Sequence, residues 1–253
     1  MVVRTRTRID VGAELQRALE LLQRCWVLAV PPAVASLAFG IFLVFVIFSV
    51  VAGLVGAVVL AAEGGAGRPL GALVGMGSLS LVLLVPLLLL LLFVAKALTV
   101  VAAEDAWHGR APDFGRAFGV VVRKLPDLVV AGVAIGLLAI VPAILSLVGI
   151  GILLLLGLSY CTMYVVPAIV LGGESGLGAL GASYRLVRAD LATSALAFLV
   201  MLGVGLAAQV VNAFVIHVPL VNFVSSFVVG GFAAAYTALI AARFYALQRG
   251  AAP

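Results

Sequence analysis

Residues 128–171 read LVVAGVAIGLLAIVPAILSLVGIGILLLLGLSYCTMYVVPAIVL and contain no charged side chain. As one helix with a rise of about 1.5 Å per residue, this stretch would be roughly twice as long as a hydrocarbon core of about 30 Å is thick. Ser146, Gly149 and Gly151 lie near its middle and favour a turn. The apolar residues run without the alternation of a barrel strand. The stretch therefore predicts a tight hairpin of two transmembrane helices.

The composition extends this prediction to the whole chain. Of 253 residues, 65% are hydrophobic and 10% are charged, and the mean hydropathy is +1.34. Soluble domains carry about 25% charged residues, so this chain has too few polar groups to cover a globular surface. Because only helices or closed barrels satisfy their backbone groups in lipid, we predict an all-α polytopic protein, with one membrane domain over residues 1–253. Six transmembrane spans are expected, at 26–61, 78–101, 127–147, 149–171, 191–216 and 219–245.

The first apolar run, Trp26 to Ala62, is too long for one ordinary span and short for two. We expect one long helix that bends near Gly53 and Gly56 and projects beyond the far side of the membrane. Two shorter spans are the alternative. At the other end of the chain, Pro219 divides the fifth span from the sixth.

The basic residues predict the orientation. With six spans, fourteen of the fifteen Lys and Arg side chains fall on the side of the N-terminus, and Arg68 alone falls opposite. Because cytoplasmic loops carry an excess of Lys and Arg, both termini are expected in the cytoplasm and the chain in the cell membrane. This orientation explains the net charge of +5, so nucleic acid is not an expected partner. The opening residues, MVVRTRTRID, lack the apolar core of a signal peptide, so the first apolar segment is expected to be retained.

Each pair of spans follows a segment with the pattern of a short amphipathic helix at the cytoplasmic interface. In the first segment, an apolar stripe lies opposite Glu14 and Arg17. Asp10, Asp113 and Glu174 are placed to cap the three helices. An interfacial helix followed by two spans therefore recurs three times, which suggests a pseudo-threefold repeat. The repeat units cover approximately residues 9–101, 113–171 and 175–246.

Two stretches carry a resemblance to a known family. GAELQRALELLQRCW (residues 12–26) leads directly into the first span, and VVPAIVLGGESGLGALGASYRLVRADL (residues 165–191) places a proline near the end of the fourth. Together they resemble, over nearly the whole chain, the six-span membrane domain of glycerophosphoryl diester phosphodiesterase, with its YciC-like relatives. The resemblance does not imply phosphodiesterase activity, because that reaction belongs to a separate soluble barrel for which this chain has no room. It implies a structural signature at Pro167, Glu174, Ala179, Leu180, Ser183 and Leu186.

Polar residues within the spans are candidates for ligand binding, because they are costly in lipid unless they are paired. Lys96 is the only charged residue well inside an apolar helix. Its ammonium group either reaches the cytoplasmic interface or binds an ion or a lipid headgroup. The other candidates gather at the outer end of the last hairpin, where they either bridge helices or line an outward-facing cavity. They are Gln209, Asn212, His217, Asn222, Ser225 and Ser226.

Charged residues on the cytoplasmic side form a second candidate group. Glu104, Asp105 and His108 are the densest ionisable cluster, and they are expected to pair with Arg185 or Arg188. Such pairing predicts a collar of salt bridges. The alternative is that the basic residues bind anionic lipid. The whole group comprises Glu104, Asp105, His108, Arg110, Arg116, Arg123, Lys124, Arg185 and Arg188.

Small residues in the spans favour close packing of helices. Gly132 and Gly136 form a GxxxG pattern, and Gly230 and Gly231 lie in the last span. The sequence has no P-loop, HExxH, GxSxG or CxxC motif. The two histidines are expected on opposite sides of the membrane, so they cannot share a metal. We expect neither a metal nor a cofactor.

These patterns predict a non-enzymatic membrane protein that transports or organises lipids or other hydrophobic or amphipathic molecules. Membrane lipids are the expected partners, with a partner membrane protein or a second copy of the chain as further candidates. An alternative is a scaffold or accessory subunit that stabilises another membrane protein. A third hypothesis is an intramembrane enzyme that modifies lipids with Glu104, Asp105 and His108.

Overall fold

The computed structural model describes residues 10–62, 90–214 and 219–250, and every regular element in these ranges is a helix. The all-α prediction is therefore confirmed for the described residues. In chain order the helices are α1 (Val11–Arg24), η1 (Trp26–Ala29), α2 (Val30–Ala62), a helix over residues 90–107, α4 (Phe114–Arg123), α5 (Leu125–Leu145), η2 (Ser146–Val148), α6 (Ile150–Thr162), α7 (Val165–Val170), α8 (Gly176–Ala189), α9 (Leu191–Phe214) and α10 (Pro219–Arg249).

The described residues contain four to five candidate membrane spans. Four segments are long and apolar enough to cross a membrane, and they correspond to the third to sixth predicted spans. A fifth candidate is the bent pair of Val11–Arg24 and Trp26–Phe42. Residues 78–89 of the second predicted span lie outside the described residues, so the count of six remains a prediction. The four segments are Leu125–Val148, Ile150–Val170, Leu191–Phe214 and Val221–Arg249.

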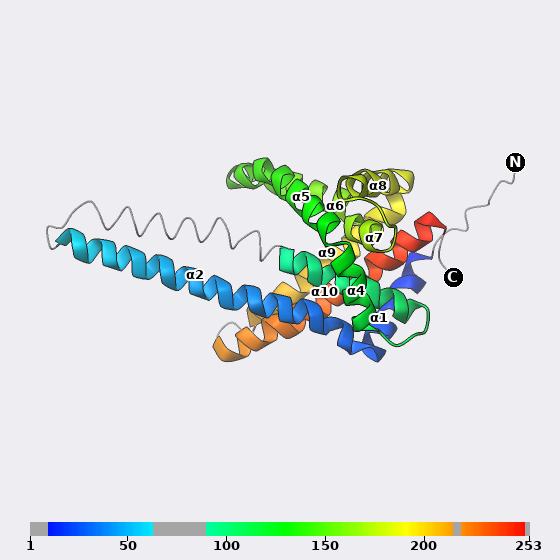
Figure 1. The fold of residues 1–253 in the computed structure, drawn as a ribbon, viewed down its shortest axis with the longest axis horizontal. Coiled ribbons are helices and arrows are strands. Elements are labelled where there is room, and N and C mark those ends of the chain that lie inside the picture. Colours follow the sequence, from blue (N-terminus) through cyan, green and yellow to red (C-terminus); the bar gives the residue numbers. More distant parts are fainter. Residues whose placement is uncertain (1–9, 63–89, 215–218, 251–253) are drawn as a thin grey trace, which may run out of the picture.

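The first apolar run forms one helix rather than two. α2 is continuous over 33 residues, which is about 50 Å at 1.5 Å per residue. Pro31 and Pro32 are tolerated in its first turn, where backbone N–H groups have no partner within the helix. Figure 1 shows α2 as a nearly straight rod, so the bend expected near Gly53 and Gly56 is not present. The sharp turn lies instead at Cys25, where α1 meets the following helix at 93°.

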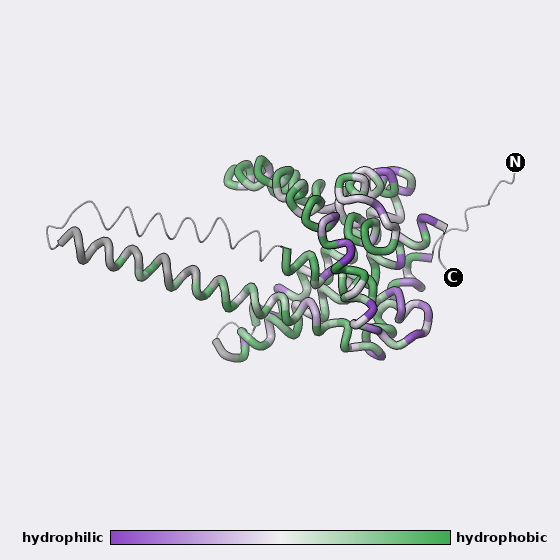
Figure 2. The backbone as a smooth tube through the Cα atoms, in the orientation of Figure 1, coloured by the Kyte–Doolittle hydropathy of each residue, from purple (hydrophilic) through white to green (hydrophobic). Residues whose placement is uncertain are grey.

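The helices form a base from which three arms extend, and the α9–α10 arm packs on the first part of α2 (Figure 1). We call α2, the α5–α6 hairpin and the α9–α10 hairpin the arms. The base is the opposite end of the molecule, which contains α1, α4, α7, α8 and the C-terminal half of α10. Figure 2 shows that hydrophilic residues gather in the base, whereas the α5–α6 arm is almost entirely hydrophobic. The polarity thus changes along the direction in which the arms extend, as expected of a chain that crosses from water into lipid.

The hydrophobic core lies in the base. Its largest fully buried side chains include Leu28 of η1, Leu128 of α5, Tyr164 before α7, and Leu239 and Phe244 of α10, so four separate parts of the chain contribute to it. The short helix α7 is buried along most of its length. In the four apolar segments of the α5–α6 and α9–α10 arms, by contrast, at most 39% of the most apolar 18 residues is buried within the molecule. The base is therefore a packed core, and the arms leave most of their apolar surface uncovered.

Two of the three predicted helix caps are confirmed. Asp10 accepts a hydrogen bond from the N–H of Ala13 at the start of α1, and Asp113 accepts one from the N–H of Arg116 at the start of α4. The third is wrong, because Ser175 rather than Glu174 caps α8. The shorter serine hydroxyl lies directly before the helix, where it reaches the third N–H. α1, α4 and α8 each precede an arm, but the threefold repeat remains a prediction.

The glycines of the spans differ in what surrounds them. At Gly231 a side-chain Cβ would lie 2.7 Å from Cβ of Ala33, so α10 packs closely on α2 as predicted. At Gly132 and Gly136 on α5, an added Cβ meets nothing within 4 Å among the described residues. The close packing predicted for this GxxxG pattern is therefore wrong within the molecule, because α5 presents that face outward. Gly149 has a φ of +83° and makes the predicted turn between α5 and α6.

Candidate functional site

Four of the predicted outer polar residues make hydrogen bonds within the α9–α10 arm, one between the two helices and one within α10. The hydroxyl of Ser225 on α10 donates to Oδ1 of Asn212 on α9, with an oxygen–oxygen distance of 3.2 Å. The hydroxyl of Ser226 donates to the carbonyl of Asn222, one turn earlier in α10. Of the two interpretations left open by the sequence, these contacts favour helix bridging.

The remaining predicted ligand-binding residues are not brought together. The side chain of Lys96 is exposed on the helix over residues 90–107, between the buried Ala95 and Ala97. Gln209 is exposed on α9. His217 lies outside the described residues. Lys96 and Gln209 lie on separate helices, and no hydrogen bond joins them in the part of the chain that the structure describes.

Asp105 is the centre of the charged group in the base. Its side chain is buried, and Oδ1 lies 2.6 Å from Nη2 of Arg116 and 3.0 Å from Nη2 of Arg110. The backbone carbonyl of Asp105 accepts from the N–H groups of His108 and Arg110, so the same residue shapes the following turn. Nδ1 of His108 donates to the carbonyl of Glu104 at 2.8 Å. These contacts hold the segment between the helix over residues 90–107 and α4 against the base.

The expected pairing of this cluster with Arg185 or Arg188 is wrong. Arg110 and Arg116 reach Asp105 across a short turn of the chain, so they compensate its charge first. The guanidinium of Arg188 lies 5.7 Å from the ring centre of Tyr184 on its own helix, α8. The side chains of Arg185 and Arg123 are exposed. The collar therefore consists of separate local contacts in place of one network.

Lys124 and Asp127 fasten the start of α8 to the start of α5. Nζ of Lys124 lies 3.6 Å from Oδ2 of Asp127 and donates to the carbonyl of Gly173 at 3.3 Å. Oδ1 of Asp127 accepts from the N–H of Gly176, the first residue of α8. A Cβ at Gly176 would lie 2.5 Å from the Asp127 carbonyl, so only glycine permits this close approach. Lys124 thus contributes to packing within the base.

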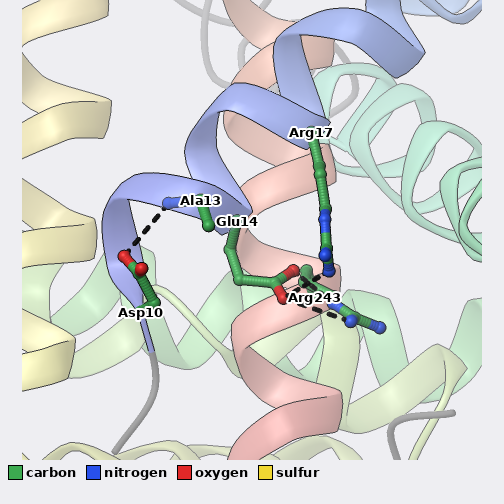
Figure 3. A network of polar contacts seen from close by, with 5 residues as sticks. All are labelled: Asp10, Ala13, Glu14, Arg17 and Arg243. Carbon is green, nitrogen blue, oxygen red and sulfur yellow. Dashed lines mark hydrogen bonds and ion pairs between the residues drawn. The ribbon is translucent and has the colours of Figure 1, made fainter.

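The sequence analysis missed the ion pair in the interior of the base. Figure 3 shows Glu14 of α1 between Arg243 of α10 and Arg17. Nε and Nη2 of Arg243 lie 2.7 and 3.4 Å from the two carboxylate oxygens, and Nη1 of Arg17 lies 3.3 Å from one of them. The Glu14 and Arg243 side chains are only 12% and 9% exposed. Glu14 therefore lies in a packed interface, although the helical pattern placed it on the polar face.

Trp107 completes this arrangement at the end of the helix over residues 90–107. Its ring centre lies 4.9 Å from the guanidinium carbon of Arg243, a cation–π contact. The indole N–H donates to the carbonyl of Leu239, one turn earlier in α10. Arg243 is thus held by a carboxylate and by an aromatic ring. Both contacts join segments that are distant in sequence.

Two cavities flank Trp107 and Arg243. The larger has a volume of about 400 Å³ and is lined by Arg17, Glu20, Leu21, Arg24, Trp107 and Arg243. The smaller, of about 210 Å³, is bordered on the other side by Glu104, His108, Tyr245 and Arg249, among others. Asp105 lines neither of the two. The larger cavity is the candidate functional site, because three guanidinium groups and an indole ring converge on it.

A second buried polar network lies deeper in the base. Nε2 of Gln248 on α10 donates to the hydroxyl oxygens of Ser194 and Tyr164, at 3.0 and 3.4 Å. The hydroxyl of Ser183 on α8 donates to the carbonyl of Cys161 and accepts from the N–H of Tyr164. These bonds join α8, α9 and α10 to the break between α6 and α7. Ser183 is one of the signature residues implied by the family resemblance. It is buried, and its hydrogen bonds hold helices together, so its role here is structural.

The fold is all-helical, with four to five apolar helices in the described residues that are long enough to span a membrane, which is compatible with a multi-pass membrane protein. Comparisons with models of protein families, with curated proteins and with solved structures find no match. The family resemblance of the sequence therefore remains a prediction. Within the described residues, no three His, Cys, Asp or Glu side chains are placed to hold a metal ion.

Proposed function

We propose that this chain is a non-enzymatic, six-span protein of the cell membrane that organises or transports lipids or other amphipathic molecules. The observation that carries the proposal is the contrast between a closed base and three arms, of which the α5–α6 arm stands apart from the other two (Figure 1). A compact bundle would cover its helices with one another, whereas each arm here presents apolar side chains outward. In a bilayer, acyl chains would fill the space between the arms.

The base fits a position at the cytoplasmic interface. Exposed apolar side chains accompany exposed arginines on its short helices, such as Phe118 and Arg123 on α4, or Leu177 and Arg185 on α8. Helices of this kind lie in the headgroup region, with apolar residues in lipid and basic residues near phosphates. This arrangement supports amphipathic helices at the interface and both termini in the cytoplasm.

The arms favour amphipathic over polar ligands. Two of the candidate spans, Ile150–Val170 and Leu191–Phe214, contain no Asp, Glu, Lys or Arg. The polar bridge between Asn212 and Ser225 is short and internal to one arm. A polar solute would therefore cross the arms without a continuous series of partners, at a high cost in free energy. A lipid can keep its headgroup beside the base and its tails between the arms.

The proposal is tested with the purified full chain. Mass spectrometry of extracted lipids is expected to find phospholipid retained through purification in mild detergent. Spin-labelled lipids in proteoliposomes are expected to show more immobilised lipid than a compact six-helix protein of similar mass. An assay that quenches labelled lipid in the outer leaflet only then separates the two roles. Transport moves labelled lipid between leaflets, whereas organisation leaves its distribution unchanged. If no lipid is retained, immobilised or moved, the proposal is wrong.

A scaffold is the second candidate, and one observation favours it. On the face of α5 that carries Gly132 and Gly136, no atom of the described residues lies within 4 Å of a Cβ added at either glycine, so a helix of another protein could approach closely. Replacing both glycines with leucine is expected to release a partner and to reduce the mass of the complex extracted in mild detergent. The matched control replaces Gly203 and Gly205 of α9, which also face open space. An unchanged mass in the α5 variant rules out a scaffold role for this face.

A further inference from the structure

The cavity of about 400 Å³ lies where the base meets the first arm. Its lining comes from α1, from the end of the helix over residues 90–107 and from α10. From its geometry and charge, and building on the proposed function, we infer that this cavity binds a phosphate group, as the headgroup of an anionic phospholipid or as a soluble phosphate ester. Its volume falls within the range of about 300–1,000 Å³ that is typical of small-ligand sites.

The balance of charge around the cavity favours an anion. Arg17 and Arg243 share the single carboxylate of Glu14, so one guanidinium charge remains uncompensated there. Arg24 has no carboxylate of the described residues within ion-pair distance. Glu20 is the opposing group, and its carboxylate accepts a hydrogen bond from Gln16. Three guanidinium groups therefore face two carboxylates, which leaves a net positive charge.

The donors around the cavity suit phosphate in geometry as well as in charge. A guanidinium group has five N–H donors in a planar fork that matches two phosphate oxygens. Arg243 uses Nε and Nη2 for Glu14, while Trp107 covers one face of its guanidinium group. These contacts fix Arg243 before a ligand arrives. Arg17 is 62% exposed and can move toward the ligand.

The position along the chain favours a lipid source for the phosphate. Arg24 is the last residue of α1, and the chain turns by 93° at Cys25 to enter the first arm. The next residue, Trp26, is 59% exposed. Exposed tryptophan beside arginine at the start of an apolar helix is typical of the headgroup level of a membrane. The cavity would then meet phosphates at the depth where they lie in the bilayer.

Trp107 supplies a direct measurement of binding. The chain has two tryptophans, so the W26F variant keeps Trp107 as the single tryptophan, at the wall of the cavity, and excitation at long wavelength avoids the tyrosines. This full-length variant is titrated with glycerol phosphate in detergent. In parallel it is placed in nanodiscs of phosphatidylcholine with increasing phosphatidylglycerol. A saturable change in Trp107 emission is expected with phosphatidylglycerol, and a response to glycerol phosphate alone identifies a soluble ligand. No saturable change with either probe overturns the inference.

Three variants separate the cavity from general surface charge. In the W26F background, R17Q with R24Q is expected to weaken binding by at least about tenfold, because two charge-assisted donors are lost. R185Q with R188Q removes the same charge from α8 and is expected to change affinity by less than about twofold. E20Q removes the opposing carboxylate and is expected to strengthen binding. Equal weakening by the two double variants overturns the inference, because it indicates surface attraction only.

The outcomes also separate this inference from the proposed function. If the R17Q/R24Q protein still retains and immobilises lipid but wild-type and variant bind phosphate equally, the site is wrong and the function stands. If glycerol phosphate binds at Trp107 while no lipid is retained, the site stands and the lipid function is wrong. Thermal unfolding of each variant in detergent confirms that the base remains folded.

Discussion

The base and the arms share one long apolar stretch of the sequence, residues 128–171, yet its side chains are covered to very different extents in the two regions. Tyr164 in the base is fully buried, and its backbone and hydroxyl both make hydrogen bonds. Leu147, at the turn between α5 and α6, is 88% exposed. Both residues belong to the same uncharged stretch of the sequence. The comparison teaches that hydropathy predicts burial in an apolar medium and does not tell whether protein or lipid supplies it.

Polar contacts follow the same division. In the base they are buried and join segments that are distant in sequence, as Glu14 and Arg243 do. In the α9–α10 arm the bridge from Ser225 to Asn212 joins neighbouring helices of one hairpin. A buried charge without its partner is costly, whereas a hydrogen bond between helices in lipid is worth little. Substitutions in the base are therefore expected to have larger effects than those in the arms.

The largest effect is expected from Glu14→Ala. This change removes the carboxylate that pairs with the buried guanidinium group of Arg243. The Trp107 ring still lies against that guanidinium group, but it carries no negative charge. Removing one partner of a buried ion pair costs about 3–5 kcal/mol, and the residual exposure of the pair places the expected loss near the lower end. Thermal unfolding in detergent, followed by fluorescence, measures it.

Arg17→Ala is the matched control for this prediction. It removes the other partner of Glu14, which is largely exposed, so the expected loss is at most about 1 kcal/mol. Comparable losses in the two variants would mean that the Glu14–Arg243 pair is not buried in the folded protein in detergent. The contrast between base and arms would then lose its main support.

A smaller effect is expected from Gly176→Ala, at the junction of α8 and α5. The added Cβ would lie 2.5 Å from the Asp127 carbonyl and 2.9 Å from Cβ of Val130, so the two helices must separate. Overpacking of this kind costs about 1–3 kcal/mol. Gly132→Ala, in the open part of α5, is expected to be neutral or to stabilise by up to about 1 kcal/mol, because alanine favours the helix. Thermal unfolding of the two variants in the same detergent tests the difference, and an equal loss in both contradicts it.

Features set by neighbouring residues could be predicted from the sequence. The turn at Gly149, the caps at Asp10 and Asp113 and the start of α10 at Pro219 each depend on a few adjacent residues. The shape of the first apolar run could not, because length alone does not distinguish one projecting helix with a bend from a straight one. The structure has the straight helix, α2.

The contacts of the base could not be predicted in the same way. Glu14 and Arg243 are 229 residues apart, and nothing local distinguishes Arg243 from the other arginines of the predicted cytoplasmic side. The helical pattern placed Glu14 on a polar face, which is correct for an isolated helix on a surface. It fails here because α10 packs on that face of α1 and places Arg243 against Glu14. Glu14 can be buried there because the guanidinium group compensates its charge.

The smallest effect is expected at the bridge between Asn212 and Ser225. A double-mutant cycle with alanine at both positions is expected to give a coupling energy of about 0.6 kcal/mol, since helices separated in a membrane also find polar partners. Ser226 is the matched control, because its hydroxyl donates to Asn222 within α10 and its coupling to Asn212 is expected to be near zero. Thermal unfolding of the four proteins of each cycle measures both energies. A coupling above about 2 kcal/mol for Asn212 and Ser225 would exceed the largest values typical of membrane helices. Polar contacts would then hold the α9–α10 hairpin as firmly as they hold the base, and the contrast between base and arms would fail for this arm.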